Sequence, residues 1–388
     1  MPSMSTGNDI AACGMLPALY PAELAAERTA VLVTGASGYV AGPLVQRLLA
    51  AGHTVHATVR NPGHEGSVAH LKALPGAEQR LKLFKADLLE PGSFNEAVQG
   101  CTVVFHTASP FVTTAGYGEQ ARKALVEPAV QGTENVLSAA DASPSVRRVV
   151  LTSSCAAVYN AGNDKPHGTF FTEEDWNSGS SLWENPYSYS KTMAERRAHQ
   201  LAAKASHWDL VVMNPALVLG PPVSSRADGE SVTLMRRMLQ GEMSLAMPKA
   251  ALGVVDVRDL AAAHCLAAFT PAAKGRYILC AATKYIHELQ SEVHRQFPRS
   301  VAEYKVLLPK WLVWLVGPLA GMPRDVIRTN VGFFPQFSSA KAQTELGLSF
   351  TPMEHTVGDM CRAMAALGMV KVHASQEFQP KAPAGSAP

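Results

Sequence analysis

Short apolar runs alternate with helical patterns along the first 215 residues of the chain. The first run, 30–33, is entirely apolar, as expected of a strand that is buried on both faces of a sheet. Further runs follow at 54–59, 81–87, 102–106, 148–151 and 210–213. Between them, stretches such as 128–140 and 190–204 show helical patterns. Strands that alternate with helices predict an α/β fold with a parallel sheet covered on both faces.

The regularity weakens after residue 215. The pattern at 221–225 is typical of a loop, that at 232–240 of a helix and that at 253–257 of another strand. No internal repeat and no linker divides the chain. We therefore expect one unit over 29–367, a Rossmann doubly wound parallel sheet with a smaller C-terminal substrate-binding lobe. The cofactor part is assigned to about 29–215 plus 253–282, and the lobe to about 216–252 and 283–350.

The two ends of the chain differ from the rest in composition. Residues 1–28 carry three acids and a single arginine, with no basic start followed by an apolar run, so neither a secretory signal nor a transit peptide is predicted. We expect a flexible extension there, with one short helix. Residues 379–388 are rich in Pro, Ala, Gly and Ser, which predicts a flexible tail over 368–388.

The overall composition narrows the classes of function. Hydrophobic residues make up 47% of the chain and charged residues 17%, and the formal net charge is +2. These values exclude a disordered chain and argue against a nucleic-acid partner, which calls for a basic excess. The six cysteines show no CxxC spacing and no Cys/His cluster. We expect no metal, and reduced, mostly buried thiols in a cytoplasmic protein.

The segment 306–320, VLLPKWLVWLVGPLA, is the most apolar stretch of the chain outside the sheet. It is shorter than the roughly 20 residues of a membrane span, and Pro309, Lys310 and Pro318 interrupt it. We expect a buried or ligand-covering helix and no membrane partner. Contact with a membrane interface is the alternative.

A glycine-rich turn follows the first strand and leads into a helix. It contains Gly35, Ser37, Gly38, Tyr39 and Val40. The two glycines permit a tight turn and a close approach of backbone N–H groups to a pyrophosphate, and the helix N-terminus attracts the phosphates. In this strand–turn–helix context the turn predicts a dinucleotide site. A tight turn without a ligand is the alternative.

Arg60 stands at the end of the second predicted strand. An acidic residue at this place would bond the ribose hydroxyls of NAD, whereas the charge of an arginine suits a 2′-phosphate. The residue therefore favours NADP(H) as the cofactor. The alternative is a solvated arginine at a strand end, which is common on protein surfaces.

Three residues form a candidate catalytic set. Tyr187 and Lys191 lie one helical turn apart, so an ammonium group stands near a phenol and is expected to lower the phenol pKa from about 10. Ser154 follows a predicted strand at its C-terminal end, where open α/β sheets bind ligands. Its hydroxyl suits a hydrogen bond to a carbonyl oxygen, with turn capping as the alternative. A glycine turn, a serine and a Tyr/Lys pair in this order predict a catalytic site in which Tyr187 passes a proton to or from a substrate oxygen.

Together these motifs resemble the extended short-chain dehydrogenases/reductases, in the NAD-dependent epimerase/dehydratase superfamily. More narrowly they are similar to the branch of dihydroflavonol 4-reductases and cinnamoyl-CoA reductases. The resemblance covers roughly residues 31–367. The matching stretches are VTGASGYVA at 33, ATVRN at 57, VFHTASP at 104, VVLTSS at 149, TEEDWN at 172, PYSYSKTMAE at 186, NPALVLGPP at 214 and GVVDVRD at 253.

The resemblance implies roles for particular residues. Ser154, Tyr187 and Lys191 would be catalytic, and Tyr187 and Lys191 would also contact the cofactor, with Lys191 at the nicotinamide ribose. Further contacts to NADP(H) would come from Asp87 and Leu88 at the adenine, from Thr107, Ala108 and Ser109 along the ribose and phosphates, and from Pro215 and Val218 at the nicotinamide.

The resemblance does not fix the substrate. Dihydroflavonol reductases carry an asparagine where this chain has Tyr159, and cinnamoyl-CoA reductases carry a different sequence around the catalytic tyrosine. The family's second phosphate-binding lysine is replaced by Ser67. We expect Tyr159, the loop with Ser224 and Arg226, and the segment 308–316 to line the substrate pocket. A solvated loop is the alternative for Arg226.

The sequence thus predicts an NADPH-dependent reductase of a ketone or aldehyde on a small to medium organic substrate, with Tyr187 as proton donor. The alternatives are an oxidoreductase similar to 3β-hydroxysteroid dehydrogenases, a sugar-nucleotide epimerase or dehydratase, and a redox-sensing binding protein without chemistry. The expected partner is a small-molecule carbonyl compound, and the chain is expected to be a monomer or a homodimer.

Overall fold

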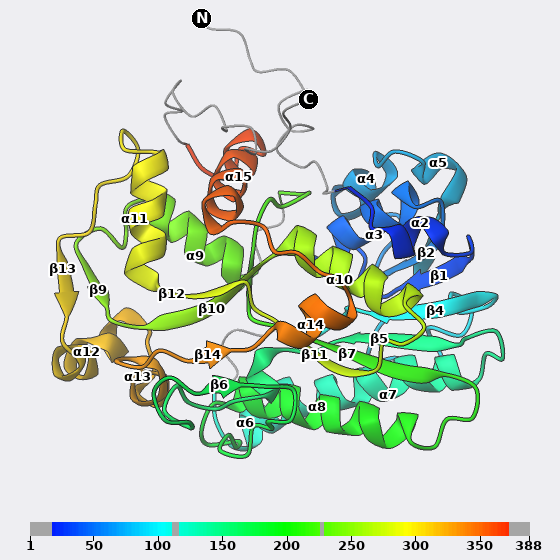
Figure 1. Cartoon of the computed structure of the whole chain (residues 1–388), viewed down its shortest axis with the longest axis horizontal. Helices are drawn as coiled ribbons and strands as arrows, with labels where there is room; N and C mark the ends of the chain where they lie inside the picture. The colour runs from blue at the N-terminus through cyan, green and yellow to red at the C-terminus, as the bar shows by residue number, and fades with distance from the viewer. Residues whose placement is uncertain (1–17, 111–115, 226–228, 372–388) are drawn as a thin grey trace, which may run out of the picture.

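The computed structural model describes residues 18–110, 116–225 and 229–371. Its centre is a seven-stranded sheet in which every neighbouring pair of strands is parallel (Figure 1). In spatial order the strands are β11 (Gly275–Leu279), β7 (Asp209–Pro215), β5 (Arg148–Thr152), β4 (Cys101–His106), β1 (Ala30–Val33), β2 (Thr54–Val59) and β3 (Leu81–Lys85). The strand order reverses beside β1, which confirms the doubly wound arrangement predicted from the sequence.

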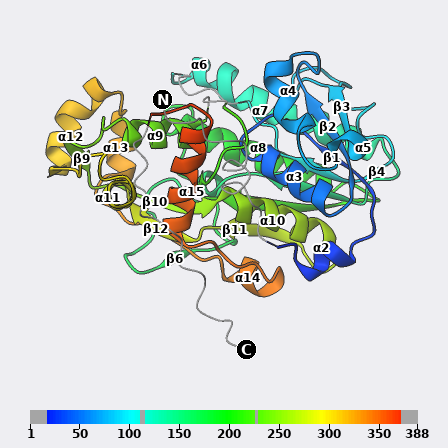
Figure 2. The ribbon, with the colours of Figure 1, turned by 90° about the horizontal axis from the view of Figure 1, so that it is seen from above.

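The strands are apolar at successive positions because the sheet is covered on both faces. In β1, Val31 and Val33 pack into one core cluster, and Leu32 packs into another on the opposite face. Two long helices lie over each face: α3 (Ala41–Ala50) and α10 (Val257–Phe269) on one, and α7 (Glu127–Asp141) and α8 (Pro186–Ala202) on the other (Figure 2). This layering places the carboxyl ends of the strands, where the candidate residues lie, along one edge of the sheet.

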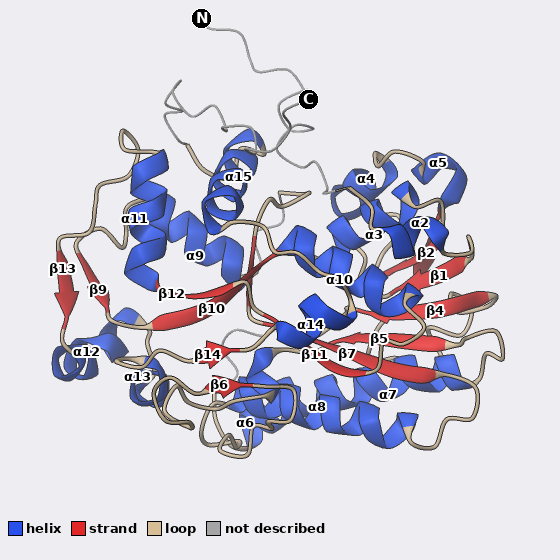
Figure 3. Cartoon of the chain, in the orientation of Figure 1, coloured by secondary structure: helices blue, strands red, loops and turns tan. Residues whose placement is uncertain are grey.

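Shorter elements complete the cofactor part. They are α4 (Glu65–Lys72), α5 (Ala77–Arg80), α6 (Glu119–Ala121), a π-helical turn (Arg122–Val126) that joins α6 to α7, and a 3₁₀ turn (Cys155–Ala157) that follows β5. Two very short strands, β6 (Phe170–Phe171) and β14 (Gln336–Phe337), pair in parallel to one side of the main sheet, as drawn in Figure 3.

The N-terminal segment packs on the fold from residue 18 onward. Helix α2 (Pro21–Ala25) carries Glu23, which forms a fully buried, two-pronged ion pair with Arg47 of α3, with both N–O distances 2.5 Å. Residues 18–28 therefore do not form the flexible extension expected from the sequence, although one short helix is present as expected. Residues 1–17 lie outside the described part, as do residues 372–388 of the expected tail.

The later half of the chain forms a lobe from small sheets and short helices (Figure 3). One sheet has the order β12-β10-β8, with β8 (Leu217–Leu219), β10 (Ala251–Asp256) and β12 (Ala282–Tyr285), and a second pairs β9 (Ala246–Pro248) with β13 (Val306–Leu308). The helices are α9 (Glu230–Leu239), α11 (Ile286–Gln296), α12 (Lys310–Val316), α13 (Arg324–Asn330), α14 (Ala340–Glu345) and α15 (Met353–Ala366). Strand β10 was expected in the cofactor part, but it pairs with β8 and β12 instead.

The segment 306–320 is not a buried helix. It forms β13, α12 and a 3₁₀ turn (Gly317–Ala320), and most of its large apolar side chains are exposed. Within α12 only Val313 is buried, because a single face of this short helix meets the lobe. Among the described residues no helix is long and apolar enough to cross a membrane.

Candidate active site

The glycine turn adopts the tight geometry that its sequence predicts. Gly35 has a positive φ of 64°, and the N–H of Gly38 donates to the Gly35 carbonyl at 2.9 Å. A Cβ added at Gly35 would lie 2.9 Å from the Cβ of Ala108, closer than side chains can approach. Glycine is therefore required here by both conformation and space. Helix α3 begins directly after Ser37, Tyr39 and Val40.

The loop after β4 is tied to this turn through Thr34. The N–H of Ala108 donates to the Thr34 hydroxyl at 3.1 Å, and the Thr107 hydroxyl donates to the Thr34 carbonyl. The Thr34 hydroxyl also lies 3.1 Å from Nδ1 of the buried His106. Burial, reinforced by the charge of Lys191, lowers the pKa of His106 to about 3, so this ring is neutral at neutral pH. The predicted residues of the two segments thus lie side by side.

The predicted adenine contacts lie at the ends of β2 and β3. Arg60 directly follows β2 and is exposed. Asp87 accepts a hydrogen bond from the N–H of Leu89, and the carbonyl of Leu88 accepts one from Asn135 of α7 at 2.7 Å. A small cavity is lined by Leu88, Ala108, Ser109, Gly132, Lys191 and Glu195, among others. It therefore connects this end of the cleft to the catalytic helix α8.

The three candidate catalytic residues come together at the ends of β5 and α8. Ser154 caps the 3₁₀ turn after β5, and its hydroxyl accepts a hydrogen bond from Ala156 N–H at 3.1 Å. Tyr187 stands in the first turn of α8, near enough to this hydroxyl for Ser154 to lower the pKa of the phenol. The ammonium group of Lys191 lies 5.8 Å from the centroid of the Tyr187 ring. Ser154 therefore caps the turn and also lies beside the candidate catalytic tyrosine.

The pKa of Tyr187 moves in the direction opposite to our expectation. Tyr187 is 42% exposed as a residue, yet the atoms packed around its phenol raise its pKa to about 12. The nearby Glu230 carboxylate adds to the rise, and the hydrogen bond with Ser154 opposes it. The expected lowering by Lys191 is absent because that ammonium group is directed to another partner. Tyr187 is therefore a neutral phenol at neutral pH, which is the form that donates a proton.

That partner of Lys191 is Ser109, whose hydroxyl accepts a hydrogen bond from Nζ at 2.9 Å. Burial lowers the pKa of Lys191 to about 8, and the charge of Glu195 opposes this effect. The contact joins α8 to the loop after β4, so one residue links the predicted phosphate path to the catalytic helix.

Glu195 is a buried residue of the site that the sequence reasoning missed. Its carboxylate accepts hydrogen bonds from Ser153, from Asn214 at 2.8 Å and from Arg276 at 2.6 Å. These partners hold the ends of β5, β7 and β11 against α8. A signal was present in the sequence, because Glu195 continues the four-residue spacing of Tyr187 and Lys191 along one helix face.

Asn185 is a second missed residue, two positions before Tyr187. Among the described residues other than glycine it alone has a positive φ, 48°. Its N–H donates to Asp325 of α13 at 3.1 Å, and its side-chain amide donates to the Asn160 side chain at 2.8 Å. Asp325 also accepts from the Tyr117 hydroxyl at 2.9 Å. A strained residue at the start of the catalytic helix is thus held by the lobe.

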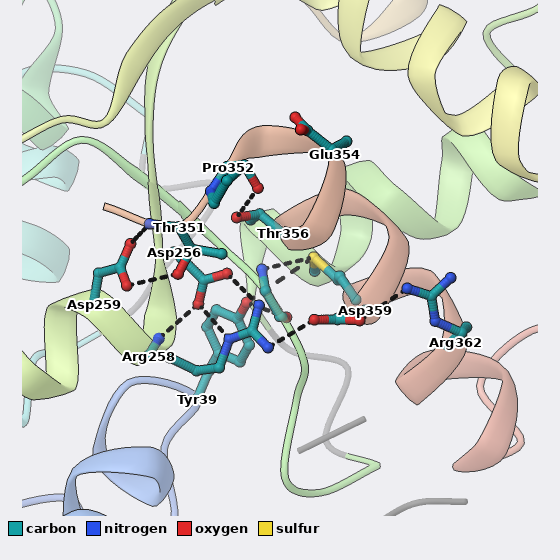
Figure 4. Close-up of polar contacts among 12 residues, drawn as sticks. Tyr39, Asp256, Arg258, Asp259, Thr351, Pro352, Glu354, Thr356, Asp359 and Arg362 are labelled. Atoms are coloured by element: carbon teal, nitrogen blue, oxygen red, sulfur yellow. Dashed lines mark hydrogen bonds and ion pairs between the residues drawn. The ribbon is translucent and has the colours of Figure 1, made fainter. Parts of the chain in front are cut away.

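The glycine turn is also anchored to the last helix, as Figure 4 shows. The Tyr39 hydroxyl donates to the Gly220 carbonyl at 2.7 Å, and the Gly220 N–H lies 3.3 Å from the Met360 sulfur in α15. Beside it, Arg258 of α10 bridges Asp256 and Asp359, with N–O distances of 2.8 and 2.7 Å. The hydroxyl of Tyr39 is therefore engaged within the protein, and the charge cluster at the start of α10 joins α10 to α15.

The remaining predicted residues differ in how closely they approach the catalytic set. Asn214, directly before Pro215, donates to the Ser154 carbonyl at 3.1 Å, and Val218 lies in β8 opposite Val255. The Tyr159 ring packs against Phe171 and Phe337, with centroids 5.3 and 5.0 Å away. Ser224 is partly exposed in the loop after β8, and Arg226 lies outside the described residues.

No group of three or more metal-ligating side chains occurs within the parts of the chain that the structure describes. Five cysteines fall in those parts, and all five are buried and free.

The sequence was compared with protein families and with known proteins. Residues 31–280 match the NAD dependent epimerase/dehydratase family. Cinnamoyl-CoA reductase CAD2 of Medicago truncatula is 38% identical over 346 residues, covering 86% of this chain and 95% of that protein. A putative anthocyanidin reductase of Ginkgo biloba is 36% identical over 304 residues, covering 75% and 85% of the two chains.

Solved structures give the same result. Gre2 of Candida albicans, in complex with NADPH, superposes with a TM-score of 0.72 at 28% identity, covering 87% of this chain and 99% of its own. Vestitone reductase from alfalfa superposes with a TM-score of 0.67 at 25% identity, covering 88% and 100%. The chain therefore belongs to the NAD-dependent epimerase/dehydratase family, as an oxidoreductase of the extended short-chain dehydrogenase/reductase type in the branch of dihydroflavonol and cinnamoyl-CoA reductases.

Proposed function

We propose that this protein is an NADPH-dependent reductase of a ketone or aldehyde on a small to medium organic substrate. One observation carries the proposal: Ser154, Tyr187 and Lys191 meet at the carboxyl edge of the sheet, with the Lys191 ammonium group 5.8 Å from the centroid of the Tyr187 ring. The relatives are named as reductases, and Gre2 is a structure with NADPH, which supports the same reading.

The residues at the cleft fit NADP(H). The turn at Gly35 leaves no room for a Cβ, as expected where backbone N–H groups approach a pyrophosphate, and Arg60 stands where NAD-selective sites carry an acid. We propose that the cofactor is held by Gly35, Ser37, Gly38, Tyr39, Val40, Arg60, Asp87, Leu88, Thr107, Ala108, Ser109, Tyr187, Lys191, Pro215 and Val218. When bound, its nicotinamide supplies a hydride to the carbonyl carbon.

The chain's own residues then handle the carbonyl oxygen. The neutral phenol of Tyr187 donates its proton to this oxygen as negative charge develops there. Ser154 holds the oxygen by a hydrogen bond, in the manner of an oxyanion donor. The proposed role of Lys191 is at the nicotinamide ribose, because its ammonium group is directed to Ser109 and not to the phenol. Ser109 keeps Lys191 oriented, and Glu195 offsets the effect of burial on its charge.

The division of the chain follows from this site. We propose a cofactor part over about 29–215 plus 253–282 and a substrate lobe over about 216–252 and 283–350. Strand β10 (Ala251–Asp256), which overlaps the start of the second cofactor range, is assigned to the lobe because it pairs with β8 and β12. Tyr159 and Ser224 are proposed to face the substrate, as is Arg226. A cytoplasmic location is proposed because the five described cysteines are free. The chain is proposed to act as a monomer or homodimer.

The test is oxidation of NADPH by the purified protein in the presence of aldehydes, diketones, dihydroflavonols, hydroxycinnamoyl thioesters and sterols. We expect turnover with at least one ketone or aldehyde and slower turnover with NADH. Protein that purifies with tightly bound NAD and converts a sugar nucleotide without net oxidation would favour the epimerase alternative. Oxidation of a sterol with preference for NAD⁺ would favour the hydroxysteroid dehydrogenase alternative.

A further inference from the structure

Strand β13 and helix α12 lie at the end of the lobe, away from the seven-stranded sheet (Figure 1), and we call this region, with its exposed apolar side chains, the apolar corner. It consists of β13, α12, the 3₁₀ turn after α12 and the residue before β9. We propose that this apolar corner docks on a phospholipid surface that carries anionic headgroups. The proposal uses none of the catalytic residues or the proposed cofactor contacts, and it gives the segment 308–316, which was expected at the substrate pocket, a different role.

The corner holds eight of the fourteen large apolar residues that are exposed among the described residues. They are Leu245, Val306, Leu307, Trp311, Trp314, Leu315, Val316 and Leu319. Trp311 is 69% exposed, Leu315 65% and Leu319 90%. Large apolar side chains that are exposed together in one part of the fold are typical of an interaction site.

The packing of α12 leaves its apolar face without a partner among the residues that the structure describes. Only Val313 points inward, where it packs with Ala250, Ile327 and Val331. The tryptophans and leucines of the helix therefore remain on the outside. Tryptophan and leucine on one side of a short helix, flanked by cations, are the residue types that settle into the headgroup region of a bilayer.

The charges around the corner select an anionic partner. Residues 304–324 contain Lys305, Lys310 and Arg324 and no aspartate or glutamate. Arg324 lies 5.5 Å from the Trp314 ring centroid, so a cation stands directly beside the exposed ring. The adjacent Asp325 is occupied by Tyr117 and Asn185. A lipid surface with negative headgroups satisfies both the cations and the apolar side chains.

The same charges disfavour a second copy of this chain as the occupant. A two-fold contact places a surface patch against itself, so the three cations of one copy would meet those of the other. The apolar side chains would be covered, but like charges would be brought together without acids between them.

Vesicle co-sedimentation of the full chain tests the proposal. We expect the protein to sediment with phosphatidylcholine vesicles that contain phosphatidylserine, and to remain in the supernatant with phosphatidylcholine alone or at high salt. Trp311→Ser/Leu315→Ser/Leu319→Ser should lower the partition coefficient by at least about tenfold. Lys305→Gln/Lys310→Gln should lower it by about fivefold for each charge removed. Leu24→Ser/Leu89→Ser, which removes two exposed leucines elsewhere, is the matched control and should bind as the wild type does.

Thermal unfolding of each variant and light scattering of the wild type complete the design. Variants that unfold cooperatively near the wild-type temperature show that lost binding reflects the surface and not the fold. The proposal is overturned if the wild type does not sediment with the anionic vesicles, or if the triple variant binds as tightly as the wild type. It is also overturned if the wild type is a dimer that the triple variant dissociates, because a second copy then covers the corner.

Discussion

The two sides of the cleft are built in different ways. On the cofactor side, strands, turn and helix follow one another along the chain, and the turn around Gly35 is held mainly by residues of the first β-strands and their loops, with the Tyr39 contact to Gly220 as the exception. On the lobe side, sheets of two or three short strands are joined by single polar side chains from distant segments. Asp325 reaches Asn185 across 140 positions, and Arg258 reaches Asp359 across 101.

This difference between local and long-range contacts determines how much of the function of each side can be inferred from the sequence. The cofactor side is organised by local pattern, so its chemistry is visible as motifs. The lobe is organised by long-range contacts, and its influence on catalysis passes through residues such as Asn185 that carry no motif of their own. Most of the variants below test either the cofactor side or the lobe side.

The largest effect on stability is expected on the cofactor side, at the buried pair of Glu23 and Arg47. Glu23→Gln leaves the Arg47 charge buried without its carboxylate, so the free energy of unfolding should fall by about 3–5 kcal/mol. Urea unfolding measures the change. Glu27→Gln, at an exposed position in the same segment, is the control and should change the value by less than about 0.5 kcal/mol. A loss below about 1 kcal/mol for Glu23→Gln would show that α2 contributes little to the fold.

Arg60 gives the next largest effect, and it concerns the cofactor alone. Arg60→Ala removes a charged hydrogen-bond donor to the 2′-phosphate, which is worth about 1.5–3 kcal/mol, so the Kd for NADPH should rise about tenfold to a hundredfold. The Kd for NADH should stay unchanged, which serves as the internal control. Titration of cofactor fluorescence measures both values. An equal rise in the Kd for NADPH and for NADH would show that Arg60 does not recognise the 2′-phosphate.

Asn185 tests how the lobe side acts on catalysis. Asn185→Ala loses both the amide contact to Asn160 and the residue type that tolerates a positive φ, and kcat should fall about tenfold because Tyr187 is displaced. Asn185→Gly keeps the backbone conformation and should recover part of this loss. KM should change less than kcat in both variants. Equal kcat values for the alanine variant and the wild type would show that the strained turn does not position Tyr187.

The smallest effect is a pH dependence of stability to which buried histidines and the buried Asp259 contribute with opposite signs. Burial lowers the pKa of His106 to about 3 and that of His264 to about 4, both below the ordinary value of 6.5. Between pH 6.5 and about 4 the unfolded chain therefore binds more protons, and each histidine lowers the free energy of unfolding by up to about 1.4 kcal/mol per pH unit as the pH falls. Asp259, which binds Thr351, has its pKa raised to about 6 by burial, so its contribution to stability grows as the pH falls.

Urea midpoints at pH 7, 6 and 5 measure this dependence. His264→Gln should flatten the decline, whereas His64→Gln, at an exposed histidine, should leave it unchanged. If His264→Gln has the slope of the wild type, the buried ring is not the source of the acid sensitivity.

Most of the cofactor side could be predicted from the sequence, because its determinants are local. The strand at 30–33, the turn at Gly35 and the spacing of Tyr187 and Lys191 each follow from a few consecutive residues. The pairing of β10 could not be predicted, because an apolar strand of this length fits either sheet. The burial of Glu23 also could not be predicted, since glutamate is typically exposed to solvent and only the partner Arg47 allows it to be buried.

Two further misses have physical causes of the same kind. The raised pKa of Tyr187 depends on how its phenol is packed and on Glu230, neither of which the spacing of Tyr187 and Lys191 reveals. The segment 306–320 was expected to be buried because it is apolar, but hydrophobicity alone does not say which face of a short helix meets the protein. The substrate pocket stays a prediction, since its proposed residues lie on the lobe side.

The most direct test of the account is the turnover of Tyr187→Phe with a substrate that the wild type reduces. If Tyr187 donates the proton, kcat should fall by about 10²–10⁴-fold, because the phenol proton is lost. The Kd for NADPH should remain close to the wild-type value. A phenylalanine variant that reduces the carbonyl as fast as the wild type would contradict the assignment of Tyr187 as proton donor.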